Sequence, residues 1–129
     1  MADDEGFTTR GRLQRDRAMM AGRDMSSPVG VTHFFSVNAP GARPVVAEAA
    51  LVDLGVRDIV ADEELTGDGH WHLAAFDSLL LSPETILRRE EQMHHLAWAT
   101  DVRYDGWKVT LTAGEERVLS ARREQDPPT

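Results

Sequence analysis

The stretch that decides the fold is Val102-Arg103-Tyr104-Asp105-Gly106-Trp107, which follows a long amphipathic segment. Valine and tyrosine favour extended backbone, and Trp107 resumes the extended pattern through Val109 and Leu111. The pair Asp105-Gly106 interrupts this run with residues that suit a β-bulge, because glycine reaches positive φ without a Cβ clash. The sequence therefore predicts a terminal strand over residues 102–111 with a kink at Gly106.

The segment before this strand has the signals of a helix. Ser82 is a typical N-cap residue, and Pro83 suits the first helical position because its missing N–H costs nothing there. The predicted buried stripe consists of Ile86, Met93, Leu96 and Ala97. Further upstream, residues 56–63 and 70–81 read as two strands around the turn at residues 66–69, Thr-Gly-Asp-Gly, and so predict a hairpin.

The N-terminal half supplies a strand between two helices. The strand is expected over Val29–Val37, with His33, Phe35 and Val37 on one face. A short helix is expected from Arg12 to about Ala21, stopping at Gly22. The helix at residues 43–54 is followed by Gly55 at its C′ position, and its predicted packing residues are Val45, Val46, Ala49, Ala50 and Leu54.

Together these segments predict an α+β fold with the order β-α-β-β-α-β behind an N-terminal helix. Right-handed crossovers make this a ferredoxin-like sandwich, in which two helices cover one face of a four-stranded antiparallel sheet. We expect the first and third strands to form a parallel central pair. Residues 12–111 form the single domain, residues 1–11 are expected to be disordered, and the charged residues 112–129 are expected to be a flexible tail, either frayed helix or disorder.

Charge is concentrated in the predicted domain. The formal net charge is −8, and residues 28–111 hold thirteen acids against six bases. Such a domain repels phosphate backbones and favours basic partners, which argues against direct nucleic-acid binding. Maintaining solubility is the plainer explanation of the same charge. The chain has no cysteine, its acidic N-terminus lacks a secretory signal, and its apolar runs are too short to span a membrane, so we expect a cytoplasmic protein.

Few residues suggest catalysis or metal binding. His70 and His72 share one face of a strand, but His94 and His95 point about 100° apart on a helix, and no spacing matches a zinc motif. No nucleophile elbow, P-loop or dinucleotide-binding motif occurs. The sequence therefore predicts a protein without enzymatic activity, cofactor or metal. The alternative is a small-ligand or metal-binding domain that uses the His70/His72 face.

Tryptophans mark candidate core and interface positions. Trp107 is expected in the core, packed with Trp98 near the kink at Gly106. Trp71, between the two strand histidines, is compatible with either core or interface, because tryptophan is common in both.

A helix leading into a Tyr104-Asp105-Gly106-Trp107 strand resembles the bacterial regulators of ribonuclease activity, type B, which inhibit ribonuclease E. The resemblance spans roughly residues 13–111 and implies a non-catalytic protein that binds this nuclease and lowers its activity. Two features differ from well-known members: the C-terminal tail contains Arg117, Arg122 and Arg123 among its acids, and Lys108 directly follows Trp107.

The acidic edge of the predicted hairpin is the candidate surface for such a partner. The aromatic and histidine face beside this edge is the second possible contact surface. We expect the protein to be a monomer or a weak homodimer. The candidate partner-binding residues are Asp62, Glu63, Glu64, Asp68, His70, Trp71 and His72.

Overall fold

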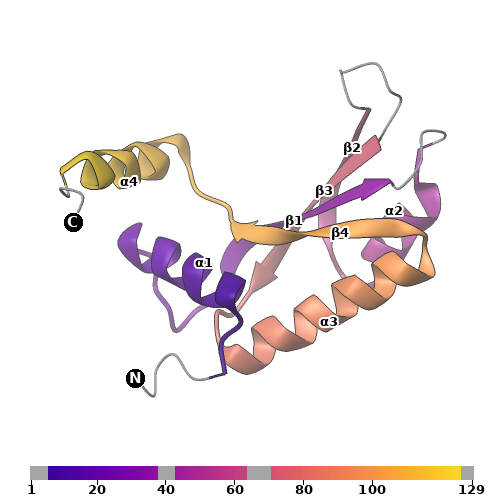
Figure 1. Cartoon of the computed structure of the whole chain (residues 1–129), viewed down its shortest axis with the longest axis horizontal. Coiled ribbons are helices and arrows are strands. Elements are labelled where there is room, and N and C mark those ends of the chain that lie inside the picture. Colours follow the sequence, from indigo (N-terminus) through magenta and orange to yellow (C-terminus); the bar gives the residue numbers. More distant parts are fainter. Residues whose placement is uncertain (1–5, 38–42, 64–70, 126–129) are drawn as a thin grey trace.

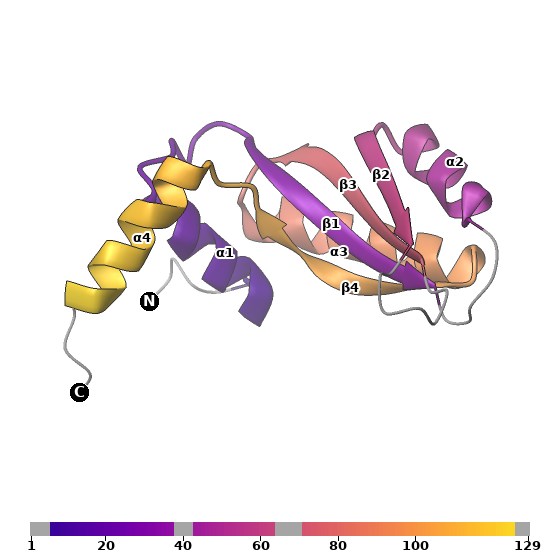
Figure 2. The same ribbon diagram turned by 90° about the horizontal axis from the view of Figure 1, so that it is seen from above.

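The computed structural model describes residues 6–37, 43–63 and 71–125, which form a mixed α+β fold. This part of the chain contains four helices and four strands. Helices α1 and α4 lie together at one end of the sheet, while α2 lies at the other (Figure 1, Figure 2). The elements are α1 (Thr9–Met20), β1 (Val29–Val37), α2 (Val45–Asp53), β2 (Arg57–Glu63), β3 (Trp71–Leu79), α3 (Pro83–Ala99), β4 (Val102–Val109) and α4 (Ala113–Gln125).

The strands form one open antiparallel sheet in the order β2-β3-β1-β4. The predicted β2–β3 hairpin is confirmed, although its turn at residues 66–69 lies outside the described residues. The prediction that β1 and β3 are the central pair is also confirmed, but the prediction that they run parallel is wrong. A crossover through α2 makes β1 and β2 parallel, and the hairpin then reverses the chain, so β3 must run against β1.

The helices α2 and α3 pack on the same face of the sheet. One core cluster joins Phe35 of β1 and Leu73 of β3 with Leu51 of α2 and Met93 of α3. In α3, the predicted stripe of Ile86, Met93, Leu96 and Ala97 is buried as expected, and the Ser82 side chain caps the first turn by accepting a hydrogen bond from the Thr85 N–H.

In α2, the predicted packing residues are partly wrong. Val45 and Val46 are 61% and 65% exposed, and Ala49 is exposed too, whereas Ala47 and Leu51 are buried. Only Glu48 and Asp53 interrupt the apolar sequence of this helix, so its pattern does not indicate which face packs on the sheet.

The kink in β4 is present as a β-bulge. Phe34 of β1 pairs with Gly106, and the next residue, Phe35, pairs with Tyr104, so Asp105 is the extra residue of β4. Gly106 has φ of +112°, a conformation that side chains with a Cβ rarely adopt. The bulge shifts the alternation of β4 so that both Tyr104 and Trp107 face the helices.

Helix α1 covers the edge strand β4. The buried Gln14 side chain accepts a hydrogen bond from the Val109 N–H at 2.8 Å, and Arg10 donates to the Trp107 carbonyl at 3.3 Å. The helix begins at Thr9 because Thr8 caps it, three residues before the predicted start, so residues 9–11 are helical rather than part of an irregular N-terminus.

Of the two alternatives for the C-terminal segment, the helix is the one observed over residues 113–125, and residues 126–129 lie outside the described residues. Arg23 holds the first turn of α4 through hydrogen bonds of 2.6 and 2.7 Å to Glu115, and the Arg23 guanidinium lowers the pKa of Glu115 to about 2. Leu119 is buried beside α1.

Candidate functional site

The Tyr-Asp-Gly-Trp segment of β4 sends its side chains in two directions. Tyr104 and Trp107 point inward, where the tyrosine hydroxyl lies 2.8 Å from His33 Nδ1 and the Trp107 indole N–H donates to Glu90 at 2.8 Å. Asp105 points outward and accepts a hydrogen bond from Arg103. The segment is therefore a structural junction that ties β4 to β1 and α3.

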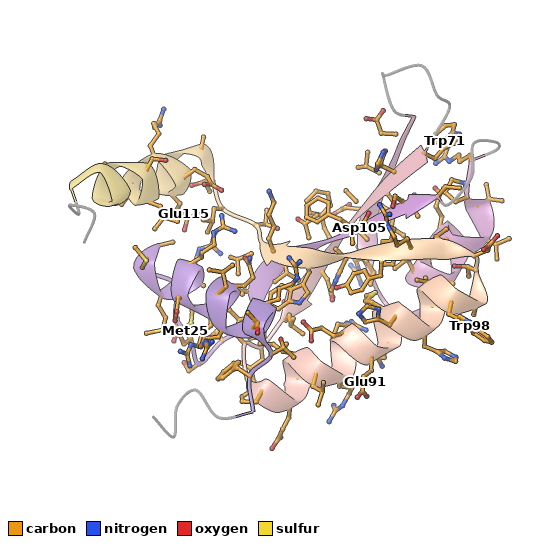
Figure 3. All side chains as sticks on the ribbon, in the orientation of Figure 1. Met25, Trp71, Glu91, Trp98, Asp105 and Glu115 are labelled. Atoms are coloured by element: carbon orange, nitrogen blue, oxygen red, sulfur yellow. The ribbon has the colours of Figure 1, made fainter. Side chains whose placement is uncertain are left out.

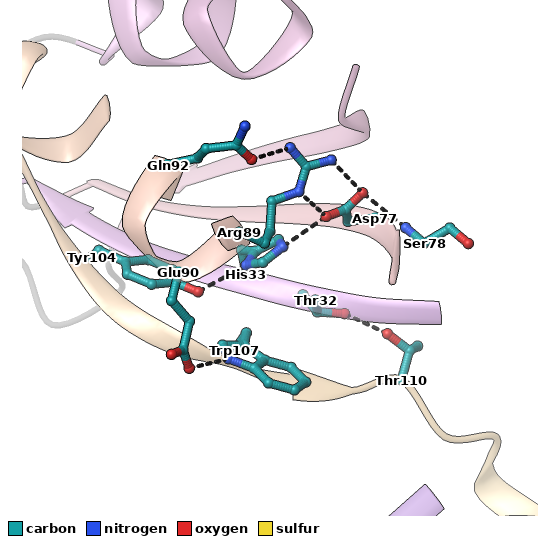
Figure 4. Close-up of polar contacts among 10 residues, drawn as sticks. All are labelled: Thr32, His33, Asp77, Ser78, Arg89, Glu90, Gln92, Tyr104, Trp107 and Thr110. Atoms are coloured by element: carbon teal, nitrogen blue, oxygen red, sulfur yellow. Dashed lines mark hydrogen bonds and ion pairs between the residues drawn. The ribbon is translucent and has the colours of Figure 1, made fainter. Parts of the chain in front are cut away.

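A buried polar chain extends from this junction across the sheet (Figure 4). His33 has no exposed surface, and its Nε2 lies 3.0 Å from Asp77 Oδ2. Arg89 of α3 binds the same carboxylate with two hydrogen bonds, of 2.9 and 3.2 Å. Sequence reasoning placed His33 on the same strand face as Phe35 but did not identify its hydrogen-bond partners, Asp77 of β3 and Tyr104 of β4.

The electrostatics of this chain favour a stabilising role. Burial raises the pKa of Asp77, but the hydrogen bonds from His33 and Arg89 outweigh burial and hold that pKa below its ordinary value. Burial also raises the pKa of the Tyr104 hydroxyl, and the Glu90 carboxylate adds to this effect. The network thus holds an ionised carboxylate and a neutral phenol, and it presents no activated nucleophile to solvent.

The histidines do not gather into a metal site in the described residues. No group of three or more histidine, cysteine, aspartate or glutamate side chains is placed to hold a metal ion within residues 6–37, 43–63 and 71–125. His94 packs edge-on against the Tyr104 ring, and His95 lies near Trp98. His70, one half of the predicted histidine face, lies outside the described part of the chain.

The predicted partner-binding residues that are described lie where β2 ends and β3 begins, which we call the hairpin end. Asp62 pairs across the strands with His72, and Glu63 pairs with Trp71. Asp62 and His72 are exposed. Trp71 is half-buried, which is compatible with either of its two predicted positions, the core or an interface. Glu64 and Asp68, like His70, lie outside the described residues.

Trp98 is a surface residue that sequence reasoning misplaced. Trp107 is 1% exposed, as predicted, but Trp98 is 83% exposed and does not pack with it. At 100° per residue, position 98 stands about 140° from Met93, well outside the buried stripe of α3. The helical period therefore contained the signal, and the prediction overlooked it in favour of the usual burial of tryptophan. Figure 3 shows Trp98 and Trp71 at the same end of the molecule.

The sheet, α2 and α3 together correspond to a known family. A model of the family described as regulator of ribonuclease activity B, RraB, matches residues 16–109. The chain belongs to the RraB family. The match runs from within α1 to the last residue of β4 and includes the Tyr104–Trp107 segment. A comparison with curated proteins finds no match.

RraB membership implies a role in regulating ribonuclease activity. Within the described residues, no helix has the length and apolar character needed to cross a membrane.

Proposed function

We propose that this RraB-family protein regulates a ribonuclease of the ribonuclease E/G type by binding to it directly. The observation that carries the proposal is the family match over the whole sheet and both helices that cover it. The protein acts without catalysis of its own, without a cofactor and without direct contact to RNA, as a cytoplasmic monomer or weak homodimer. The strand order, with every neighbouring pair antiparallel, supports the ferredoxin-like assignment for residues 29–109.

Charge supports a protein partner over a nucleic acid. Thirteen acids against six bases in residues 28–111 create a negative potential that attracts a basic surface and repels phosphate. The hairpin end offers part of this charge to solvent through the exposed Asp62. We propose that this end, with Asp62, Glu63, Glu64, Asp68, His70, Trp71 and His72, contacts the nuclease.

The test is binding to the purified full-length nuclease at two salt concentrations. The triple variant Asp62→Lys, Glu63→Lys and Glu64→Lys should bind at least about tenfold more weakly at low salt, because attraction across a charged interface becomes repulsion. The difference should shrink at high salt, which screens charges over about 8 Å at physiological ionic strength.

A control variant separates local contact from net charge. Asp16→Lys, Glu84→Lys and Glu124→Lys together change the net charge equally, but they lie on α1, on the first turn of α3 and on α4, away from the hairpin end. This variant should retain most of the affinity. Equal losses in both variants would show that net charge alone drives association, and no binding by the wild-type protein would remove the regulator proposal.

A further inference from the structure

The most exposed large apolar side chains of the described residues come from α2 and from the last turn of α3. Trp98 is 83% exposed, and Val45, Val46 and Val52 are each more than 60% exposed. Side chains of this size are normally buried, and an exposed tryptophan beside further apolar surface marks an interaction site. The valines are separate from Trp98, since Val52 stands about 160° around α2 from Ala50 and Leu54, the α2 residues nearest to α3. Trp98 and the apolar residues between α2 and α3 beside it, Ala50, Leu54, Leu96 and Ala99, are called the α2–α3 patch.

A groove lies between the two helices of the patch. It has a volume of about 330 Å³, and its apolar lining comes from Ala50 and Leu54 of α2 and Leu96 and Ala99 of α3. His95 also lines the groove, and its ring centroid lies 6.5 Å from that of Trp98. The exposed tryptophan therefore stands beside an opening that is large enough for an aliphatic or aromatic side chain.

Unpaired carboxylates surround this apolar surface. Asp53 lines the groove, Glu91 stands on the outer face of α3, and Asp101 follows its last turn. All three are exposed, and none forms an ion pair with another residue of the described part of the chain. Two of the nearby arginines are neutralised, since Arg43 binds Glu48 and Arg103 binds Asp105. The exposed Arg88, three residues before Glu91 on α3, offsets part of the charge of that carboxylate, whereas Asp53 has no such neighbour on α2.

We propose that the α2–α3 patch is the docking site for a basic segment of the partner protein, in which apolar side chains alternate with arginine or lysine. An apolar side chain of that segment fills the groove, while its cations face the three carboxylates and the ring of Trp98, whose π face attracts cations. The proposal rests on the proposed function for the identity of the partner as the nuclease. It adds the chemistry of the segment and the surface that receives it.

Charge favours this occupant over a second copy of the chain. A symmetric dimer through the patch would place Asp53, Glu91 and Asp101 of one copy near the same carboxylates of the other. Like charges in an interface oppose association, and the net charge of −8 adds to that repulsion. The patch also lies at the hairpin end, because α3 leads directly into Val102, which pairs with the last residue of β1.

The experiment titrates the full-length ¹⁵N-labelled protein with a short synthetic peptide of alternating arginine and leucine. We expect saturable shifts of the Trp98 indole signal and of the amides of residues 50–54, and no such shifts with a peptide of alternating glutamate and leucine. Trp98→Ala should weaken peptide binding by at least about tenfold, as expected for a central tryptophan. Leu87→Ala, which removes a 45% exposed side chain from the first half of α3, should bind like the wild type.

A second variant tests the charges. Asp53→Asn with Asp101→Asn should weaken binding several-fold and flatten its salt dependence; asparagine tolerates the positive φ of 60° at Asp101, so the turn is kept. Three results would overturn the proposal. They are unchanged peptide binding by Trp98→Ala, signal shifts confined to Phe34 and Phe76 on the open face of the sheet, and self-association of the protein through the patch in the absence of peptide.

The same variants assayed with the nuclease separate the two proposals. If the wild type binds the nuclease and Trp98→Ala binds equally well, the docking site is wrong while the regulator function stands. If the wild type does not bind the nuclease but binds the arginine–leucine peptide at Trp98, the docking surface is supported and the regulator function fails.

Discussion

At the scale of single residues, the bulge in β4 requires a glycine at position 106. Its φ of +112° disfavours any side chain, and a Cβ there would lie 2.5 Å from the Arg10 guanidinium carbon. Arg10 is flexible and can move, but the backbone strain remains. We therefore expect Gly106→Ala to lower the free energy of unfolding by about 1 kcal/mol or more. Gly30→Ala is the matched control, because a Cβ at this β1 glycine meets only Thr110, at 4.0 Å. Equal urea midpoints for the two variants would contradict the strained geometry.

A single residue, Asp77, also makes the free energy of unfolding depend on pH. Its pKa is lowered in the folded protein, so its ionised form contributes stability above the unfolded-state pKa of about 3.9, and this contribution is lost as pH falls through the folded-state pKa. Asp77→Asn leaves Arg89 without its carboxylate and should cost about 2 kcal/mol at pH 7. The difference from wild type should shrink toward pH 3. Unfolding measured at both pH values checks this, and a constant difference would contradict an ionised Asp77.

At the scale of elements, α1 stabilises the fold by covering the edge of the sheet. Gln14 supplies the acceptor for the Val109 N–H, which has no neighbouring strand on that side. Gln14→Ala should cost about 1 to 2 kcal/mol, because it leaves a buried donor unpaired. Hydrogen exchange at the Val109 amide should accelerate, whereas Leu13→Ala, on the exposed side of α1, should leave that amide protected. Unaltered protection in Gln14→Ala would show that the helix is not what shields the strand.

The elements also show how far the sequence predicts the structure. The boundaries of β1, the stripe of α3 and the bulge at Gly106 were predictable, because each depends on local periodicity or backbone conformation. The packing face of α2 was not, since apolar residues occupy both of its sides. The polar chain at His33 was not predictable either, because Asp77 meets His33, and Arg89 meets Asp77, only after β3 and α3 have packed against β1. The exposure of Trp98 was within reach of the helical period.

At the scale of the whole molecule, structure and charge divide the protein into two ends. The end with α1 and α4 is held by ion pairs such as Arg23–Glu115 and Arg17–Glu116. The hairpin end has the ion pairs Arg43–Glu48 and Arg103–Asp105, and beside them it presents the exposed Trp98 and Asp101, a carboxylate without an ion-pair partner among the described residues. A protein that binds one basic partner requires only one such surface. This division is why both of the proposed contact regions lie at the same end.

The central claim, that this protein regulates a ribonuclease by binding it, is tested most directly by the rate of RNA cleavage. Purified full-length nuclease of the ribonuclease E type is assayed with increasing amounts of the wild-type protein, and heat-unfolded protein serves as the control. We predict that the cleavage rate falls to a plateau as binding saturates, with no effect of the unfolded sample. A cleavage rate that stays constant up to a large molar excess of folded protein would contradict the claim.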